Sequence, residues 1–201
     1  QSTPVDIIFI IDNSGSMGDE IASVRANIND SFAQIIGDSG VDYRVIMVSE
    51  HGGLGNESVC IEEPLSGIPT GGCNNPPAQP VAGERFFHFS VPIDSEDSWC
   101  QLIDYWDAPD EFNSAPGWGS LLRDGTFKIF VELTDDRVDC QSQSGPVYDD
   151  GGNAAQGQSA AALFYADLLA LSPAHFGSSE ARNYRWYSMV ALGNKDPNDP
   201  T

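Results

Sequence analysis

Apolar runs and amphipathic segments alternate along the chain. Residues 5–11 are a nearly continuous apolar run, which is typical of a strand buried on both faces of a parallel sheet. Residues 19–36 carry apolar side chains at helical spacing, and Gly37 and Gly40 are placed to end that helix. A second strand is predicted at 43–49. This strand is either parallel to the first, through a right-handed β-α-β crossover, or an antiparallel strand at the edge of the sheet.

The rest of the chain predicts three more strands and two more helices. The strands are expected at 84–91, 126–133 and 184–192, and the helices at 99–106 and 159–171. Because strands and helices alternate, the predicted fold is α/β, a doubly wound and mainly parallel sheet flanked by helices.

A long segment rich in Gly, Pro, Asn and Ser separates the second and third strands, at about 50–83. Ordinary connections in compact domains are much shorter. We therefore interpret this segment as a surface insertion in a single domain that spans residues 1–201. The length of 201 residues is within the range of one large domain, and an apolar content of 40% is enough for a sizeable core.

The chain has four cysteines, and none of them forms a Cys-x-x-Cys pair. A zinc site is therefore poorly supported, and an even number on loop-like segments suits two disulfides in an oxidising compartment. We expect Cys60–Cys73 within the insertion. We also expect Cys100–Cys140, because the segments that carry them should converge on one rim of the sheet. Four free buried thiols are the alternative.

The charge is strongly acidic, with 30 acidic against 9 basic residues and a net charge of −21. Such a surface repels nucleic acid and anionic membranes. Solubility in a salty or extracellular setting is the simplest explanation, and acidic loops that bind Ca²⁺ are the other. No apolar run is long enough to span a membrane. We therefore expect neither nucleic-acid binding nor direct membrane insertion.

Two of the predicted strands end in turns rich in carboxyl and hydroxyl groups. Asp12, Ser14 and Ser16 follow the first strand, and Asp135 follows the fourth. In doubly wound sheets, ligands bind beyond the carboxyl ends of the strands, where both turns should lie. Oxygen ligands suit one hard divalent cation, Mg²⁺ first and Ca²⁺ or Mn²⁺ as alternatives. The alternative role of the first turn is to cap the following helix.

The segments DIIFIIDNSGSMGDEI and FVELTDD resemble the von Willebrand factor A (vWA) domain family, in particular its bacterial secreted or surface members. Asp-x-Ser-x-Ser after a buried strand is similar to the family's metal-ion-dependent adhesion site, and the two motifs together are highly specific. The resemblance covers the order of elements from residue 5 to about 192. It implies Asp12, Ser14, Ser16 and Asp135 as metal ligands.

The family also supplies a hydroxyl ligand from the loop after the third strand, and there we choose Ser95. The usual residue is Thr in a Gly-rich setting, which this sequence lacks. Ser95 also suits a helix N-cap, and the alternative hydroxyls are Ser98, Ser120 and Thr126. Asp136 is expected to be solvated or to lie behind the ligands. The four tryptophans are expected mainly as core or loop anchors, and Trp118 is the best aromatic candidate for the alternative role of contacting a bound ligand.

The resemblance implies a metal-dependent binding or adhesion module, secreted or on the cell surface. It would engage a carboxylate on a protein or another extracellular ligand through the cation. One alternative is a scaffold domain of a surface assembly, in which the metal only holds the loops together. The other alternative is a metal-assisted hydrolase. The sequence has no Gly-x-Ser-x-Gly elbow and no evident general base, so we do not expect an enzyme. The family usually has a sixth strand and a last helix, so we expect the natural chain to continue beyond Thr201.

Overall fold

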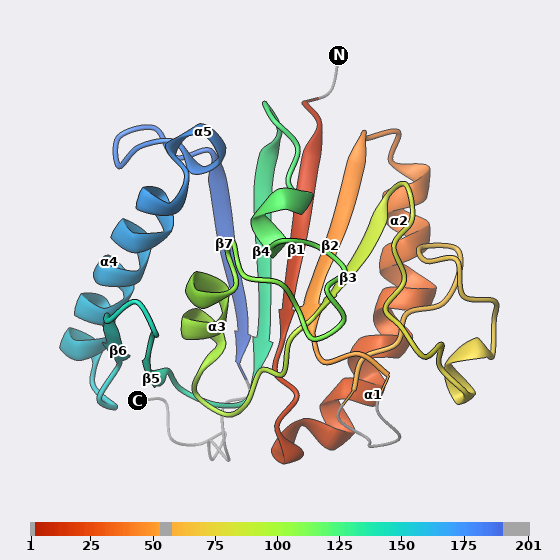
Figure 1. Ribbon diagram of the computed structural model, residues 1–201, viewed down its shortest axis with the longest axis horizontal. Helices are drawn as coiled ribbons and strands as arrows, with labels where there is room; N and C mark the ends of the chain where they lie inside the picture. The colour runs from red at the N-terminus through yellow and green to blue at the C-terminus, as the bar shows by residue number, and fades with distance from the viewer. Residues whose placement is uncertain (1–2, 53–57, 191–201) are drawn as a thin grey trace, which may run out of the picture.

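The computed structural model describes residues 3–52 and 58–190, and it has a parallel sheet between two layers of helices (Figure 1). The sheet order is β3-β2-β1-β4-β7, and every neighbouring pair is parallel. The predicted α/β fold with a mainly parallel sheet is thereby confirmed. The strands are β1 (Val5–Ile11), β2 (Tyr43–Ser49), β3 (Phe86–Ser90), β4 (Phe127–Thr134) and β7 (Tyr184–Val190).

Helices cover both faces of this sheet. One face carries a continuous helical segment made of α1 (Gly18–Asn27), a π-helical stretch η2 (Ile28–Phe32) and α2 (Ala33–Asp38). The other face carries α3 (Ser98–Asp104), α4 (Ala154–Leu171) and α5 (Pro173–Phe176). The remaining elements are short: the 3-10 turns η1 (Gly15–Met17), η3 (Gly72–Asn74) and η4 (Trp118–Leu121), and an antiparallel hairpin of β5 (Asp139–Gln141) and β6 (Val147–Asp149).

The predicted element bounds differ from the structure mainly where a side chain caps a helix. The helix predicted at 159–171 begins at Ala154, because the side chain of Asn153 accepts hydrogen bonds from the backbone N–H groups of Ala155 and Gln156. The β5–β6 hairpin and α5 were not predicted, since elements of three or four residues are too short to show a period. Residues 191–192 of the predicted last strand lie outside the described residues.

Two hydrophobic cores result from the alternation of side chains along the strands. Ile8 and Ile10 point to the face that α3, α4 and α5 cover, and Ile7, Phe9 and Ile11 point to the face of α1 and α2. The first core is rich in aromatic rings: Phe89, Trp118, Phe130, Tyr148, Phe164, Phe176 and Tyr184. The second core also receives Val59, Ile61 and Leu65 from the insertion. The insertion is therefore part of the packing over β2 and β3.

Among residues 3–52 and 58–190, no helix covers the face of α1 and α2 over its whole width. Over β4 and β7, the side chains of Tyr187 and Met189 are 55% and 60% exposed. Their neighbours Val131 and Leu133 on β4 are only partly buried. An open apolar band therefore runs along β4 and the edge strand β7.

A buried ion-pair network lies at the amino-terminal end of the sheet. The carboxylate of Asp6 is fully buried and accepts hydrogen bonds from the Arg123 Nε at 2.7 Å and the Thr126 hydroxyl at 2.7 Å. The ammonium of Lys128 is also fully buried, lies 3.9 Å from Asp6 and donates to the carbonyls of Arg123 and Thr126. Asp42, which is 63% exposed, binds the same Arg123 at 2.7 Å.

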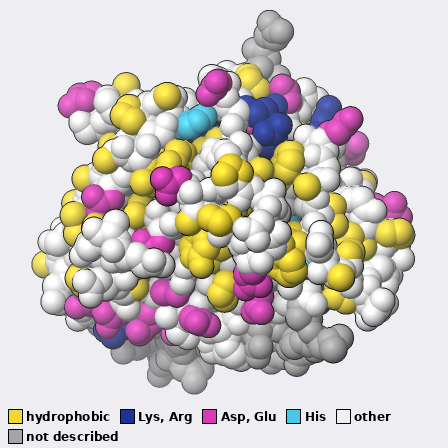
Figure 2. Space-filling model, viewed as in Figure 1, with side chains coloured by type: hydrophobic (Ala, Val, Ile, Leu, Met, Phe, Trp, Pro, Cys, Tyr) yellow, Lys and Arg dark blue, Asp and Glu magenta, His cyan; other side chains and the backbone are white. Residues whose placement is uncertain are grey.

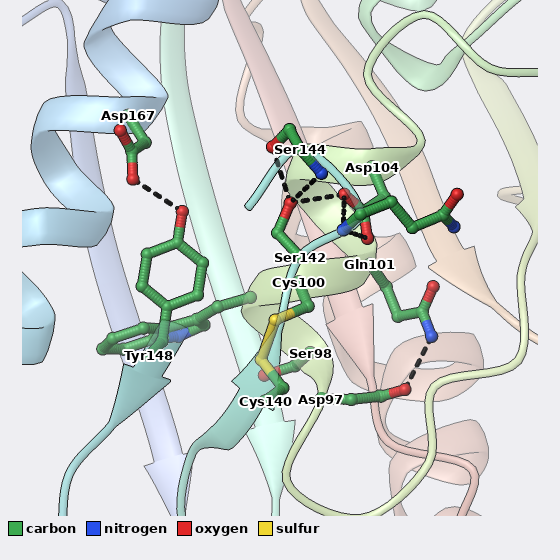
Figure 3. Close-up of a disulfide and its surroundings, with 12 residues drawn as sticks. Asp97, Ser98, Cys100, Gln101, Asp104, Cys140, Ser142, Ser144, Tyr148 and Asp167 are labelled. Carbon is green, nitrogen blue, oxygen red and sulfur yellow. Dashed lines mark hydrogen bonds between the residues drawn. A yellow bond between two sulfur atoms is a disulfide. The ribbon is translucent and has the colours of Figure 1, made fainter. Parts of the chain in front are cut away.

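Both predicted disulfides are present. Cys60–Cys73 closes part of the insertion, and Cys100–Cys140 joins α3 to β5 (Figure 3). Two disulfides are typical of proteins that fold in an oxidising compartment. In the part of the chain that the structure describes, no helix has the length and apolar character needed to cross a membrane.

His88 on β3 is packed in the interior. Its ring Nε2 lies 3.0 Å from the carbonyl of Ser49 and 3.1 Å from its hydroxyl. The pKa of His88 is lowered from 6.5 to about 3, mainly by burial and to a smaller extent by the nearby His51. The side chain is therefore neutral in the folded protein at any pH at which the protein is normally handled.

We expect His88 to make the folded state less stable as the pH falls. Below 6.5 an unfolded histidine takes up a proton, whereas folded His88 does so only near 3. The stabilisation is therefore present above the unfolded pKa and is lost on acidification, by about 2 kcal/mol between about pH 7 and about pH 5. Urea unfolding of the wild type and of His88→Gln at both pH values measures it. An equal pH dependence in the two proteins would contradict this assignment.

Candidate metal centre

The loop after β1 is held in place by the backbone of its neighbours. The Asp12 N–H donates to the carbonyl of Leu133 at 3.0 Å, which continues the pairing of β1 with β4. The Asn13 N–H donates to the carbonyl of Ile93 at 2.7 Å. This loop therefore lies between the end of β4 and the loop after β3, at the carboxyl-terminal rim of the sheet.

A chain of hydrogen-bonded oxygen atoms joins the ends of β1 and β4. The Ser14 and Ser16 hydroxyls lie 3.0 Å apart, and the Ser16 hydroxyl donates to Asp135 Oδ1 at 3.1 Å. Asp12 Oδ1 accepts from the Ser14 N–H at 2.7 Å, and Asp12 Oδ2 accepts from the Thr134 hydroxyl at 2.7 Å. The four residues predicted from the two motifs are thus brought together by the fold.

Three carboxylates gather at this point. Ligand oxygens of Asp12, Asp135 and Asp136 all lie within 4.8 Å of one another. Asp12 is only 1% exposed, whereas Asp135 and Asp136 are partly exposed. Like charges this close repel one another unless a cation or a proton neutralises them. Carboxylate and hydroxyl oxygens are the ligands of a hard divalent cation, so the donor set fits the predicted ion.

Asp136 was expected to be solvated or to lie behind the ligands, and the structure places its carboxylate in this group. The turn after β4 is fixed by a hydrogen bond of 3.0 Å from the Asp136 N–H to the Thr134 hydroxyl. That bond belongs to a short local turn, which a strand pattern does not show. The feature of the sequence that could have indicated Asp136 is that two adjacent acidic residues follow a buried strand.

The surroundings of the cluster are acidic on one side and apolar on the other. Figure 2 shows acidic side chains over much of the visible face, including a row along its lower part, whereas Lys and Arg side chains lie mainly near its top. A hollow of about 250 Å³ adjoins Thr134, and its lining includes Met17, Val24, Leu133 and Met189. A ligand at the rim would meet both kinds of surface.

The alternative hydroxyl groups, Ser98, Ser120 and Thr126, are engaged elsewhere, and Ser95 stays a prediction. Ser95 is exposed, as Ser16 is, and the Ser98 hydroxyl donates to Glu132 at 2.8 Å. The Ser120 hydroxyl donates to the carbonyl of Gly117 at 2.7 Å. Thr126 precedes β4 and therefore lies at the opposite end of the sheet, where it binds Asp6.

Trp118 does not lie at the rim either. It is fully buried, and its indole N–H donates to the carbonyl of Leu102 at 2.8 Å. Trp118 is therefore a core residue, which was its expected role, and it does not take the alternative role of contacting a ligand at the rim.

Asp97 is the acidic residue of this loop that the sequence analysis missed. Its Oδ2 accepts from the Gln101 amide at 2.6 Å (Figure 3), while its Oδ1 is buried and has no hydrogen-bond partner among the described residues. The pKa of Asp97 is raised to about 6, mainly by burial; the Gln101 hydrogen bond opposes this shift, and the charges of Asp94 and Asp12 add to it. In the sequence, Asp97 looked like an ordinary residue at a helix start.

A buried glutamate anchors this loop from behind. Glu132 on β4 is 3% exposed. Its Oε1 accepts from the Ser98 hydroxyl at 2.8 Å and the Trp99 indole at 3.0 Å, and its Oε2 accepts from the Ser188 hydroxyl at 2.6 Å and the Trp186 indole at 3.2 Å. With four donors the carboxylate is satisfied without a cation. Glu132 and the Cys100–Cys140 disulfide together fix the start of α3 beside the rim.

No protein-family model matches this chain, and no curated protein is detectably similar to it.

Proposed function

We propose that this chain is a metal-dependent binding module that engages a carboxylate of its partner through one divalent cation. Asp12, Ser14, Ser16 and Asp135 would hold the cation, for which Mg²⁺ is the first choice. The observation that carries this proposal is the chain of hydrogen-bonded oxygens that joins the end of β1 to the end of β4. The resemblance of the two motifs to the vWA adhesion site supports the same function.

The composition of the cluster explains why a partner carboxylate would bind here. When bound, the cation supplies positive charge that an acidic group of the partner can coordinate. Ser14 and Ser16 are neutral ligands, which leave more of that charge uncompensated than carboxylates would. The chain itself carries a net charge of −21, so an acidic partner would be repelled without the ion. Binding should therefore depend on it.

Two disulfides favour an extracellular setting for this function. We propose that the chain is secreted or displayed on the cell surface, where adhesion modules work. The partner would be a protein or another extracellular ligand that presents a carboxylate.

The experiment that tests this function is binding of the immobilised chain to an extracellular-matrix extract in Mg²⁺, in Mn²⁺ and in EDTA. EDTA is expected to weaken binding by more than about tenfold, which corresponds to about 1.4 kcal/mol. Ser14→Ala should weaken binding in Mg²⁺ to a similar extent, because it removes one oxygen of the cluster. The matched control is Ser39→Ala, an exposed serine at the end of α2, which should bind as the wild type does.

Equal binding in Mg²⁺ and EDTA, with Ser14→Ala unchanged, would contradict the binding function. If calorimetry showed that the same protein still binds the cation, the metal would have only the structural role of holding the loops together, as in the scaffold alternative.

A further inference from the structure

Three hollows on the side of the insertion join into one groove. The first has a volume of about 590 Å³ and lies between α2 and the insertion, which are neighbours in Figure 1. The second, of about 390 Å³, lies where β2 and β3 begin, and the third, of about 630 Å³, lies within the insertion. Tyr43 and Pro64 line both the first and the second hollow, and Gly67 and Val81 line both the second and the third. The hollows are therefore continuous.

The insertion side of the groove is held by covalent and hydrogen bonds. The Cys60–Cys73 disulfide closes the loop, and the carboxylate of Glu62 accepts from the Cys73 N–H at 2.9 Å. The far wall is fixed by His51, whose Nε2 donates to the carbonyl of Pro77 at 2.9 Å. Because these walls are already ordered, a ligand would not have to order them on binding.

The first hollow is acidic and has no counter-charge from the protein. Its lining includes Asp30, Asp38 and Glu63, which are all exposed. Among the residues that the structure describes, none of the three forms an ion pair. Asp38 is the last residue of α2, where the helix dipole disfavours a negative charge. Its carboxylate therefore does not serve the helix, and this end of the groove is suited to a cationic group.

The other end of the groove is apolar. No charged residue lines the third hollow, whose walls include Ile68, Pro76 and Val81. The second hollow has one charge of each sign, from Glu84 and Arg85. The groove thus changes from acidic at α2 to apolar within the insertion, and a ligand that matches it must change from basic to apolar along its length.

We infer that this groove binds an extended peptide segment of a partner protein, in which Lys or Arg residues adjoin apolar residues. Each hollow has the size of a common ligand pocket, and three in succession suit an extended chain. The net charge of −21 attracts a basic segment and repels a second copy of this chain. The inference does not depend on the proposed metal centre, because the metal ligands follow the carboxyl-terminal ends of β1 and β4 and line none of the three hollows.

The test is fluorescence anisotropy of a labelled peptide, in which three lysines precede Leu-Pro-Leu-Pro, titrated with the full chain in EDTA. The peptide is expected to bind, and its analogue with glutamates in place of the lysines is not. The double variant Asp30→Asn, Asp38→Asn should weaken binding by about threefold to tenfold, since it removes two exposed ion pairs. Ala78→Lys places a bulky cation at an exposed position of the third hollow and should weaken binding by at least about threefold.

The matched control is the double variant Asp124→Asn, Glu180→Gln. It removes the same charge from two exposed positions outside the groove and should change the affinity by less than about twofold. Thermal unfolding checks that Asp38→Asn does not lower Tm, as expected for a charge that the helix dipole disfavours. Equal weakening by the two double variants would reduce the attraction to general charge and overturn the inference. Tight binding of the glutamate analogue, or wild-type affinity in Ala78→Lys, would overturn it as well, and neither result would affect the proposed metal centre.

Discussion

Asp12→Asn is expected to weaken divalent-cation binding by at least about a hundredfold, or about 2.7 kcal/mol. Asp12 is the buried member of the carboxylate group and also organises the loop, through its bonds from the Ser14 N–H and the Thr134 hydroxyl. Asparagine keeps the shape and one acceptor, so the loop should survive. The charge that balances the cation is lost, and the amide N–H groups repel a cation.

Thermal unfolding provides a direct measurement of this effect. A cation at about a hundred times its Kd stabilises the folded state by about 2.7 kcal/mol, which raises Tm by about 5–10 °C for a chain of this size. The wild type should show this rise in Mg²⁺ or Ca²⁺ and lose it in EDTA, while Asp12→Asn should show none. Asp139→Asn is the control, because Asp139 is exposed nearby and pairs with Arg137. A full rise in Asp12→Asn would place the cation elsewhere.

Asp6→Ala is expected to lower the free energy of unfolding by about 3–5 kcal/mol. Asp6 and Lys128 are both fully buried, and removing the carboxylate leaves the ammonium without a counter-charge in the interior. Burial already lowers the pKa of Lys128, and the charge of Asp6 opposes that shift. The Thr126 hydroxyl and the Arg123 guanidinium would also lose an acceptor.

The same arginine provides a matched control for this second prediction. Asp42 binds Arg123 at the same distance of 2.7 Å, but its side chain is 63% exposed. Exposed ion pairs contribute about 0–1 kcal/mol, so Asp42→Ala should be nearly neutral. Urea unfolding of the two variants measures the difference. Equal losses would show that the depth of burial does not determine the energy of this network.

The fold could be predicted because its strands are long and carry a clear pattern. The predicted bounds of β1 and β2, at 5–11 and 43–49, agree with the structure residue by residue. The β5–β6 hairpin could not be predicted, because three-residue strands show no period and their pairing depends on the nearby Cys100–Cys140 disulfide and on α4. The early start of α4 depended on a single cap at Asn153.

The candidate site was predictable where its residues directly follow a strand, as Asp135 follows β4. Asp12, Ser14 and Ser16 follow one strand directly, so their position at the rim follows from the strand itself. The third side comes from a loop, and there the direction of each side chain is set by tertiary contacts. In this loop the Asp97 carboxylate is bound by Gln101 and the Ser98 hydroxyl by Glu132, contacts that no sequence pattern shows.

The open apolar band along β4 and β7 makes the colloidal behaviour of the protein depend on its charge. An edge strand with exposed apolar side chains, here Tyr187 and Met189, is a template for pairing between molecules. At neutral pH, the net charge of −21 keeps two copies apart. That protection weakens as salt screens the charge or as acid protonates the carboxylates. Concentrated stocks should therefore be kept at low ionic strength and well above the isoelectric point, where mutual repulsion outweighs the adhesion of one sheet edge to another.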